Sequence, residues 1–147
     1  MADTHGEKHA GGKLKLVVVT PEATALETAA DFVAVPLYDG ELGILPRRGP
    51  MIGRLGYGQL RVVESGHTTR LYVDGGFVQV ADDVVTVLTG RAVPVEQLDP
   101  AVAAEQLRQA RSRPAHSEET LAIRERQVMQ SRAQLRLAGR GAKVGTH

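Results

Sequence analysis

Residues able to bind a metal or act as nucleophiles are sparse in this sequence. It contains no cysteine, which excludes thiolate nucleophiles, disulfides and cysteine-ligated metals. His5 and His9 are four residues apart, a spacing that would place both imidazoles on one face of a helix. However, the segment around them has no helical pattern and offers no third ligand. We therefore predict no metal site.

Carboxylate pairs that could act as general acid and base occur at Asp82-Asp83 and at Asp39 with Glu41. Each pair stands among turn-forming residues, so we interpret them as turn and loop carboxylates. The sequence has no Gly-Lys-Ser/Thr phosphate loop, and the glycines at 53, 56 and 58 lack the dinucleotide-binding spacing. These observations predict a protein without a catalytic site or a bound cofactor.

Cations gather near the C-terminus, where six basic side chains accompany the single carboxylate Glu125. They could steer this segment to an acidic protein surface, a nucleotide or a nucleic acid. A solvated helix face, whose cations complement the C-terminal end of the helix dipole, explains the same pattern. The six residues are Arg124, Arg126, Arg132, Arg136, Arg140 and Lys143.

Length and composition limit the possible architectures. The 147 residues fit one compact domain with a small appendage, and the 18 basic residues nearly balance the 17 acidic ones. Apolar runs such as Leu16–Val19 are far shorter than the roughly 20 residues that span a bilayer. Residues 1–12 show no signal or transit pattern, and we expect a disordered tail there.

The segment from Lys13 to Val95 alternates short β-branched runs with Gly, Pro, Asp and Ser clusters, which predicts many short strands. Ser65-Gly66 and Asp82-Asp83 are predicted as tight hairpin turns. Gly75-Gly76 interrupts a strand pattern, which indicates a bulge or the close approach of another backbone. The predicted strands are Lys13–Thr20, Asp31–Pro36, Gly43–Leu45, Met51–Arg54, Gly58–Glu64, Thr68–Asp74, Gly76–Ala81 and Val84–Ala92. A sandwich or flattened barrel is the expected closure.

Two helices are predicted after Val95. The first has Asp99 as its cap and Pro100 at its first position, and it ends before Pro114. The second starts at Ser117 and is expected to end at Ala138, because Gly139 and Gly141 follow. The predicted apolar seam between the two antiparallel helices buries little surface. We therefore expect the hairpin to dock on another surface or to detach easily from its own sandwich. The seam comprises Ala103, Leu107, Ala110, Leu121, Val128 and Leu135.

Three segments together resemble the ε subunit of bacterial and chloroplast F-type ATP synthases, called δ in mitochondria. The first, Asp39–Met51, is similar to the family's acidic-Gly-Glu-x-Gly-Ile-x-Pro loop. The second, Val73–Val80 followed by Val84–Leu88, is similar to its Gly-Gly strand and Val-Thr-Val-Leu partner. The third is Gln97-Leu98-Asp99 with Ala133–Arg136.

The resemblance implies a β-sandwich of about ten strands followed by a C-terminal antiparallel α-helical hairpin. It implies a non-catalytic rotor subunit of the central stalk, coupling c-ring rotation to ATP synthesis. The implied partners are the γ subunit, the c-ring and the α/β catalytic hexamer, at the cytoplasmic face of the bacterial cell membrane. The expected organisation is a tail over 1–12, a sandwich binding γ and the c-ring over 13–95, a regulatory hairpin over 96–140 and a second disordered tail over 141–147.

Family site residues carry over by position. Within the Asp39–Met51 loop, the resemblance implies c-ring contacts for Asp39, Glu41, Arg47 and Arg48. Two consecutive arginines replace the Gly-His more usual in such loops. On the second helix it implies an inhibitory contact with an acidic segment of the β subunit, made by Arg124, Arg126, Arg132, Arg136 and Arg140.

Some family members bind ATP in the hairpin through an Ile/Leu-Asp-x-x-Arg-Ala motif and arginines of the second helix. Leu98, Asp99 and Ala103 match the motif, and Arg132 and Arg136 lie four apart. Val102 stands where the motif has its arginine, so ATP binding is predicted to be weak or absent. The alternatives are a stand-alone sandwich adaptor and a β-barrel nucleic-acid-binding module with a basic helical tail. The 3% aromatic content offers few stacking platforms for the latter.

Overall fold

The computed structural model describes residues 12–145, with side chains placed as far as residue 139. The described chain forms two compact units that meet between Ala92 and Val93. We describe them separately, as the β-domain and the helical unit. None of the described helices is long and apolar enough to cross a membrane.

The β-domain is built from one continuous sheet with the order β2-β1-β7-β6-β5-β3-β4, and β8 pairs with β6. The β1–β7 pair is parallel, and the other pairs along this order are antiparallel. The strands are β1 Leu14–Val19, β2 Thr24–Ala30, β3 Phe32–Leu37, β4 Gly40–Ile44, β5 Met51–Glu64, β6 His67–Ala81, β7 Val84–Leu88 and β8 Ala92–Pro94.

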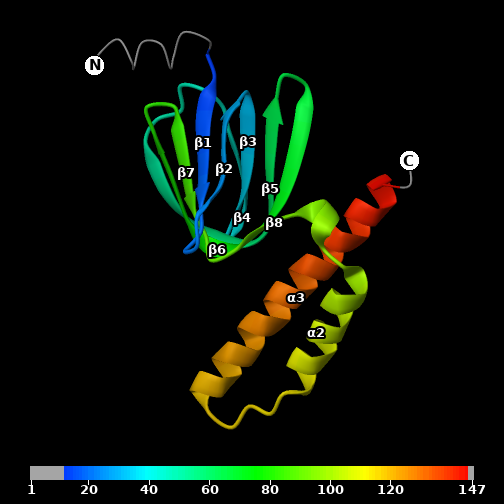
Figure 1. Ribbon diagram of the computed structural model, residues 1–147. Helices are drawn as coiled ribbons and strands as arrows, with labels where there is room; N and C mark the ends of the chain where they lie inside the picture. The colour runs from blue at the N-terminus through cyan, green and yellow to red at the C-terminus, as the bar shows by residue number, and fades with distance from the viewer. Residues whose placement is uncertain (1–11, 146–147) are drawn as a thin grey trace. The chain divides into compact units, whose positions relative to one another are not determined.

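The two long strands β5 and β6 fold back on themselves, which turns the sheet into a sandwich (Figure 1). Glu64, at the end of β5, contacts Lys13 at the start of β1. Asp83, just beyond the end of β6, accepts a hydrogen bond from the N–H of Lys15 through its carbonyl oxygen, so it lies at the same end of the domain. Each long strand therefore contributes one segment to each layer. The two halves of β5, the two halves of β6 and the six shorter strands make ten strand segments, in agreement with the sandwich of about ten strands that the resemblance implied.

The core fills the space between the two layers. Apolar side chains from each of the strands β1 to β7 form one buried cluster. Along β6 the positions that belong to this cluster change from odd numbers at Leu71 and Val73 to even numbers at Val78 and Val80. This change of parity falls on Gly75-Gly76 and marks the bend at which the strand moves from one layer to the other.

Gly75 and Gly76 have φ values of +72° and +108°, a region that disfavours other residues. A Cβ on Gly76 would overlap the carbonyl oxygen of Leu88. The register between β5 and β6 continues unchanged past this point. Of the two predicted explanations for this glycine pair, the close approach of another backbone is therefore confirmed.

Both predicted hairpin turns are present. Ser65 and Gly66 have φ values of +52° and +84°, and Asp82 and Asp83 have +52° and +62°. Two successive positive values are typical of the type I′ turn, whose twist matches that of the flanking strands. The structure adds β2, which the sequence pattern did not predict. Its sequence TALETAA is rich in alanine, which is uncommon in strands, so pairing with β1 determines its conformation.

The helical unit contains η1 Val95–Gln97, α2 Pro100–Ser112 and α3 Glu118–Gly145. Asp99 caps α2 as predicted, because its Oδ1 accepts hydrogen bonds from the N–H groups of Ala101 at 2.9 Å and Val102 at 3.5 Å. Ser117 caps α3 by accepting from the Thr120 N–H at 3.1 Å. Val95 is buried, and η1 contacts α3.

The predicted end of the second helix at Ala138 is wrong. The helix continues through Gly139 and Gly141 to Gly145, so residues 141–145, predicted as part of a disordered tail, are helical. A glycine inside a helix costs about 1 kcal/mol relative to alanine, a penalty that good helix-forming neighbours can offset. The first predicted tail and residues 146–147 fall outside the described residues, apart from Gly12.

The predicted seam is correct for α2 and wrong for α3. Ala103, Leu107 and Ala110 are buried as expected. On α3, Leu121 is 41% exposed and Val128 and Leu135 are half-buried. Among the α3 side chains that the structure describes, the buried ones are Ser131, Ala133, Gln134, Leu137 and Ala138. They form a wider stripe with helical i, i+3, i+4 spacing, which the single heptad row did not capture.

Candidate interaction surfaces

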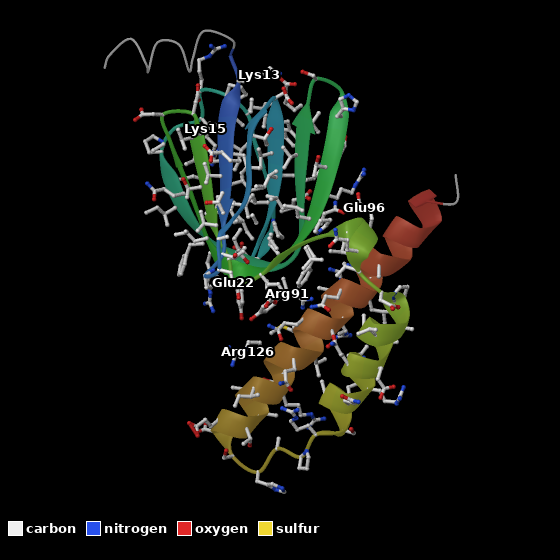
Figure 2. The ribbon with its side chains drawn as sticks, viewed as in Figure 1. Lys13, Lys15, Glu22, Arg91, Glu96 and Arg126 are labelled. Carbon is white, nitrogen blue, oxygen red and sulfur yellow. The ribbon has the colours of Figure 1, made fainter. Side chains whose placement is uncertain are left out.

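The predicted c-ring loop is divided by a strand. β4 occupies Gly40–Ile44, so Asp39 precedes the strand and Arg47 and Arg48 follow it. At about 3.3 Å per residue, β4 separates the two groups by roughly 16 Å. Figure 2 shows the two ends of the β-domain, with Lys13 and Lys15 at one and Glu22 and Arg91 at the other. We call them the Lys13 end and the Glu22 end.

Arg47 and Arg48 belong to the Lys13 end. The backbone N–H of Arg47 donates a hydrogen bond to Oδ1 of Asp83 at 2.6 Å, while the carbonyl oxygen of Asp83 accepts from the Lys15 N–H. Asp83 is buried, whereas both arginines are exposed. Arg47 has a φ of +68°, which is strained for a residue other than glycine, so the carboxylate of Asp83 helps to hold this turn.

A second polar cluster ties three segments of the chain together at the same end. Lys13 Nζ lies 3.2 Å from Asp31 and 3.3 Å from Glu64, and it also bonds the Ser65 hydroxyl. The backbone N–H of Ser65 donates to Asp31 Oδ2 at 2.7 Å. This N–H and Lys13 together lower the pKa of Asp31. Hydrogen bonds to Asp31 and Glu64 raise the pKa of Lys13.

The β3–β4 turn carries Asp39 to the Glu22 end, because β3 starts next to Lys13 and runs away from it. Asp39 and Glu41 are both exposed. Beside them, the guanidinium of Arg54 lies 4.4 Å from the centroid of the Tyr38 ring, and Tyr38 is 59% exposed. Such a stack holds the arginine in one orientation on the surface. The β3–β4 turn and the adjoining residues of β4 and β5 thus present two carboxylates, an aromatic ring and one cation.

One layer of the sandwich has an apolar outer face, in addition to its apolar inner face. Cross-strand partners share a face of a sheet, and the register aligns Val19 with Leu88, Leu88 with Phe77 and Phe77 with Arg54. The neighbouring row aligns Val17, Thr86, Gln79 and Ile52. Ile52 is 74% exposed and Phe77 55%. We call Val17, Val19, Ile52, Phe77 and Leu88 the apolar face. Exposed apolar side chains gathered on one face of a sheet mark a docking surface rather than a solvent-facing one.

The arginines predicted to inhibit lie on α3. Arg126, Arg132 and Arg136 are exposed and Arg124 is half-buried, while the side chain of Arg140 falls outside the described residues. Leu121 and Met129 are exposed on the same helix, each by 41%. The helix surface thus combines cations with apolar side chains.

The residues matching the ATP motif have structural roles. Asp99 is the helix cap, and Ala103 is buried in the seam. Val102, at the position of the motif's arginine, is 51% exposed. Arg132 and Arg136 are exposed one helical turn apart. The structure therefore retains one pair of cations but lacks the third positive side chain.

Sequence reasoning missed the apolar face and the Tyr38–Arg54 pair. The signal for the former was present, because Val17–Val19 and Val84–Leu88 are apolar at nearly every position instead of alternating. No local pattern indicated that Asp83 would bind Arg47, 36 residues earlier. Among the residues with described side chains, no three His, Asp or Glu lie together as metal ligands. His5 and His9 fall outside those residues.

A sandwich with one apolar outer face, joined to a hairpin that exposes cations, defines a protein class whose surfaces bind other proteins. Comparison with known families identifies the class further. Residues 13–95 match the family model described as "ATP synthase, Delta/Epsilon chain, beta-sandwich domain", with the same bounds as the predicted sandwich.

Two relatives are similar over nearly their whole length. The ATP synthase epsilon chain of Rhodopirellula baltica is 52% identical over 123 residues, covering 84% of this chain and 96% of the relative. That of Symbiobacterium thermophilum is 37% identical over 130 residues, covering 88% and 94%. The chain therefore belongs to the ATP synthase delta/epsilon family.

The fold also recurs in solved structures. A chain in the Euglena gracilis mitochondrial ATP synthase structure, titled OSCP/F1/c-ring in rotational state 1, superposes with a TM-score of 0.68 at 24% identity, covering 92% of this chain and 82% of that one. A chain of the Tetrahymena thermophila central stalk/c-ring structure gives 0.68 at 13% identity, covering 86% and 96%. The family assignment confirms the predicted resemblance and does not support the nucleic-acid-binding alternative.

Proposed function

We propose that this chain is the non-catalytic central-stalk subunit of an F-type ATP synthase, joining the γ subunit to the c-ring so that ring rotation is coupled to ATP synthesis. The apolar face carries the proposal. It lies on the family's sandwich domain, and its exposed Ile52, Phe77 and Leu88 need a protein partner to remove them from water. In this proposal γ covers that face.

The c-ring contact is assigned to the Glu22 end. Tyr38 and Asp39 on the β3–β4 turn, Glu41 on β4 and Arg54 on β5 combine opposite charges with an aromatic ring, a combination suited to polar loops of a partner. The chain would then sit at the cytoplasmic face of the bacterial cell membrane, attached through the ring. Of the four predicted c-ring contacts, Asp39 and Glu41 remain in this assignment. Arg47 and Arg48 are no longer assigned to the c-ring.

The hairpin is assigned a regulatory role. Arg126, Arg132 and Arg136 are exposed on α3 and can meet an acidic segment of the β subunit. Each exposed ion pair contributes about 0–1 kcal/mol, so several must act together, and salt should weaken the contact. ATP sensing by the hairpin is proposed to be weak or absent, because Val102 replaces the motif's arginine.

Affinity purification of the tagged full-length chain from mildly solubilised membranes tests the proposal. We expect γ, the c-ring and the α/β subunits to co-purify. Recovery of the chain without γ would overturn the proposal and would favour the stand-alone adaptor. A tagged chain carrying Ile52→Ser and Phe77→Ser is purified alongside. It should fold normally but recover less γ than the native chain does.

A further inference from the structure

We infer that the Arg47–Arg48 turn binds carboxylates of the γ subunit, at the edge of the apolar face, and that Asp83 is the residue that positions it. This inference rests on the proposed function, since γ is the partner assigned to that face. Under this inference the two arginines bind γ, whereas Asp39 and Glu41, from the same predicted loop, contact the c-ring.

The turn leads directly into the apolar face. It is followed by β5, whose first residue Met51 pairs with Val80 and whose second residue Ile52 belongs to the face. The Nε of Arg48 donates to the Sδ of Met51 at 3.3 Å, which holds this guanidinium group beside the start of β5. A partner seated on Ile52 would therefore come within reach of both guanidinium groups.

The charges at this edge favour an anionic partner. Within residues 12–139, Arg47 and Arg48 form no ion pair. Lys15 is the nearby cation on β1, and it is paired with Glu27 at 3.1 Å. The β6–β7 turn carries two carboxylates: Asp83, which is buried and accepts the Arg47 N–H, and Asp82, which is exposed. The exposed charges on these two turns are therefore two guanidinium groups and one carboxylate. Guanidinium groups recognise carboxylates with two parallel hydrogen bonds, which favours Asp or Glu side chains of γ.

Asp83 keeps the turn in its strained form. Its buried carboxylate accepts the Arg47 N–H at 2.6 Å, while its own φ of +62° places it in a tight turn that fixes the carboxylate position. Removing that acceptor would let Arg47 leave its φ of +68° and move both guanidinium groups. Asp83 does not touch γ in this scheme, so its effect on γ binding must pass through the two arginines.

A double-mutant cycle tests the inference with full-length protein and a γ-containing α/β hexamer that lacks this subunit, at about 50 and 300 mM salt. We expect Arg47→Gln/Arg48→Gln to weaken binding about 3- to 30-fold at low salt and less at high salt. Asp83→Ala should weaken binding in the native background and cause little further loss in the double-arginine variant. Circular dichroism melts verify folding, and Asp83→Asn, which tolerates positive φ, should show a smaller loss.

The outcomes separate the inference from the proposed function. Absence of binding by the native chain would overturn the proposed function, and the inference with it. Native binding that survives Arg47→Gln/Arg48→Gln unchanged would overturn the inference alone. The control Asp39→Asn/Glu41→Gln should leave γ binding unchanged and weaken binding to the isolated c-ring. Loss of c-ring binding in the arginine variant would also contradict the inference.

Discussion

The carbonyl oxygen of Leu88 in β7 occupies the space that a Cβ on Gly76 in β6 would need. The contact lies where β6 passes from one layer of the sandwich to the other. Gly56, on the paired strand β5, is similarly confined, because a Cβ there would lie 2.9 Å from the carbonyl oxygen of Leu37. The bend that makes a sandwich from a single sheet thus depends on two positions without side chains.

Gly76→Ala should therefore destabilise the β-domain severely. The added methyl group displaces backbone rather than a flexible side chain, and alanine is strained at a φ of +108°. The combined cost is about 2–6 kcal/mol, a large part of the stability of a small domain. Urea unfolding measures it. Gly49→Ala is the matched control, because its Cβ would meet no atom within 4 Å, and a change of about 0.5 kcal/mol or less is expected. Equal effects of the two substitutions would contradict the described bend.

Stability should fall in acid partly through Asp31. Its pKa is lowered in the folded state by the Ser65 N–H and by Lys13. A carboxylate with a lowered pKa contributes stability above its unfolded pKa near about 4, and that stability is lost as the pH falls through the folded pKa. Asp31→Asn should therefore flatten the pH dependence of unfolding below about pH 4. Glu22→Gln, an exposed carboxylate at the other end, is the control. A native-like acid profile in Asp31→Asn would contradict this account.

Placing arginine at position 102 should restore ATP binding to the hairpin. Val102 is 51% exposed on α2, so the longer side chain needs no repacking. A charge-assisted hydrogen bond to phosphate contributes about 1.5–3 kcal/mol, or roughly 10- to 150-fold in affinity. Isothermal titration should show weak or no ATP binding to the native chain and tighter binding to Val102→Arg. Val102→Gln tests whether the charge is needed. Tight binding to the native chain would show that the prediction of weak sensing is wrong.

Cutting the chain after Leu98 should raise ATP hydrolysis by the reconstituted soluble complex, because the cut removes the cations of α3. The β-domain should remain bound, since the apolar face lies wholly before the cut. A full-length variant with Arg126, Arg132 and Arg136 changed to glutamine should reproduce part of the increase. Identical hydrolysis rates with native and shortened chains would eliminate the inhibitory role while leaving the γ contact untouched.

Local chemistry in the sequence predicts much of this fold. Ser65-Gly66 and Asp82-Asp83 were predictable because two-residue hairpin turns require residues that tolerate positive φ. Asp99 and Pro100 were predictable because a helix start needs an acceptor for free N–H groups and tolerates a missing donor.

Features set by tertiary contacts were not predictable in the same way. β2 is a strand because β1 pairs with it, despite the alanine-rich sequence. α3 passes Gly139 and Gly141 because two glycines cost less than their neighbours gain in helix formation. The candidate site was divided for a similar reason. Asp39 and Arg47 are only eight positions apart in the sequence, but β4 lies between them and places them at opposite ends of the β-domain.

The dissociation constant of the full-length chain for a γ-containing α/β hexamer tests the central claim most directly. Ile52→Ser and Phe77→Ser together should weaken binding at least about 10-fold with little change in stability, because both side chains are exposed in the free chain and become buried against γ. Val102→Ser, which removes an apolar side chain that is 51% exposed on α2, should bind γ like the native chain. Unchanged affinity in the Ile52/Phe77 variant would contradict the account, because γ would then bind another surface.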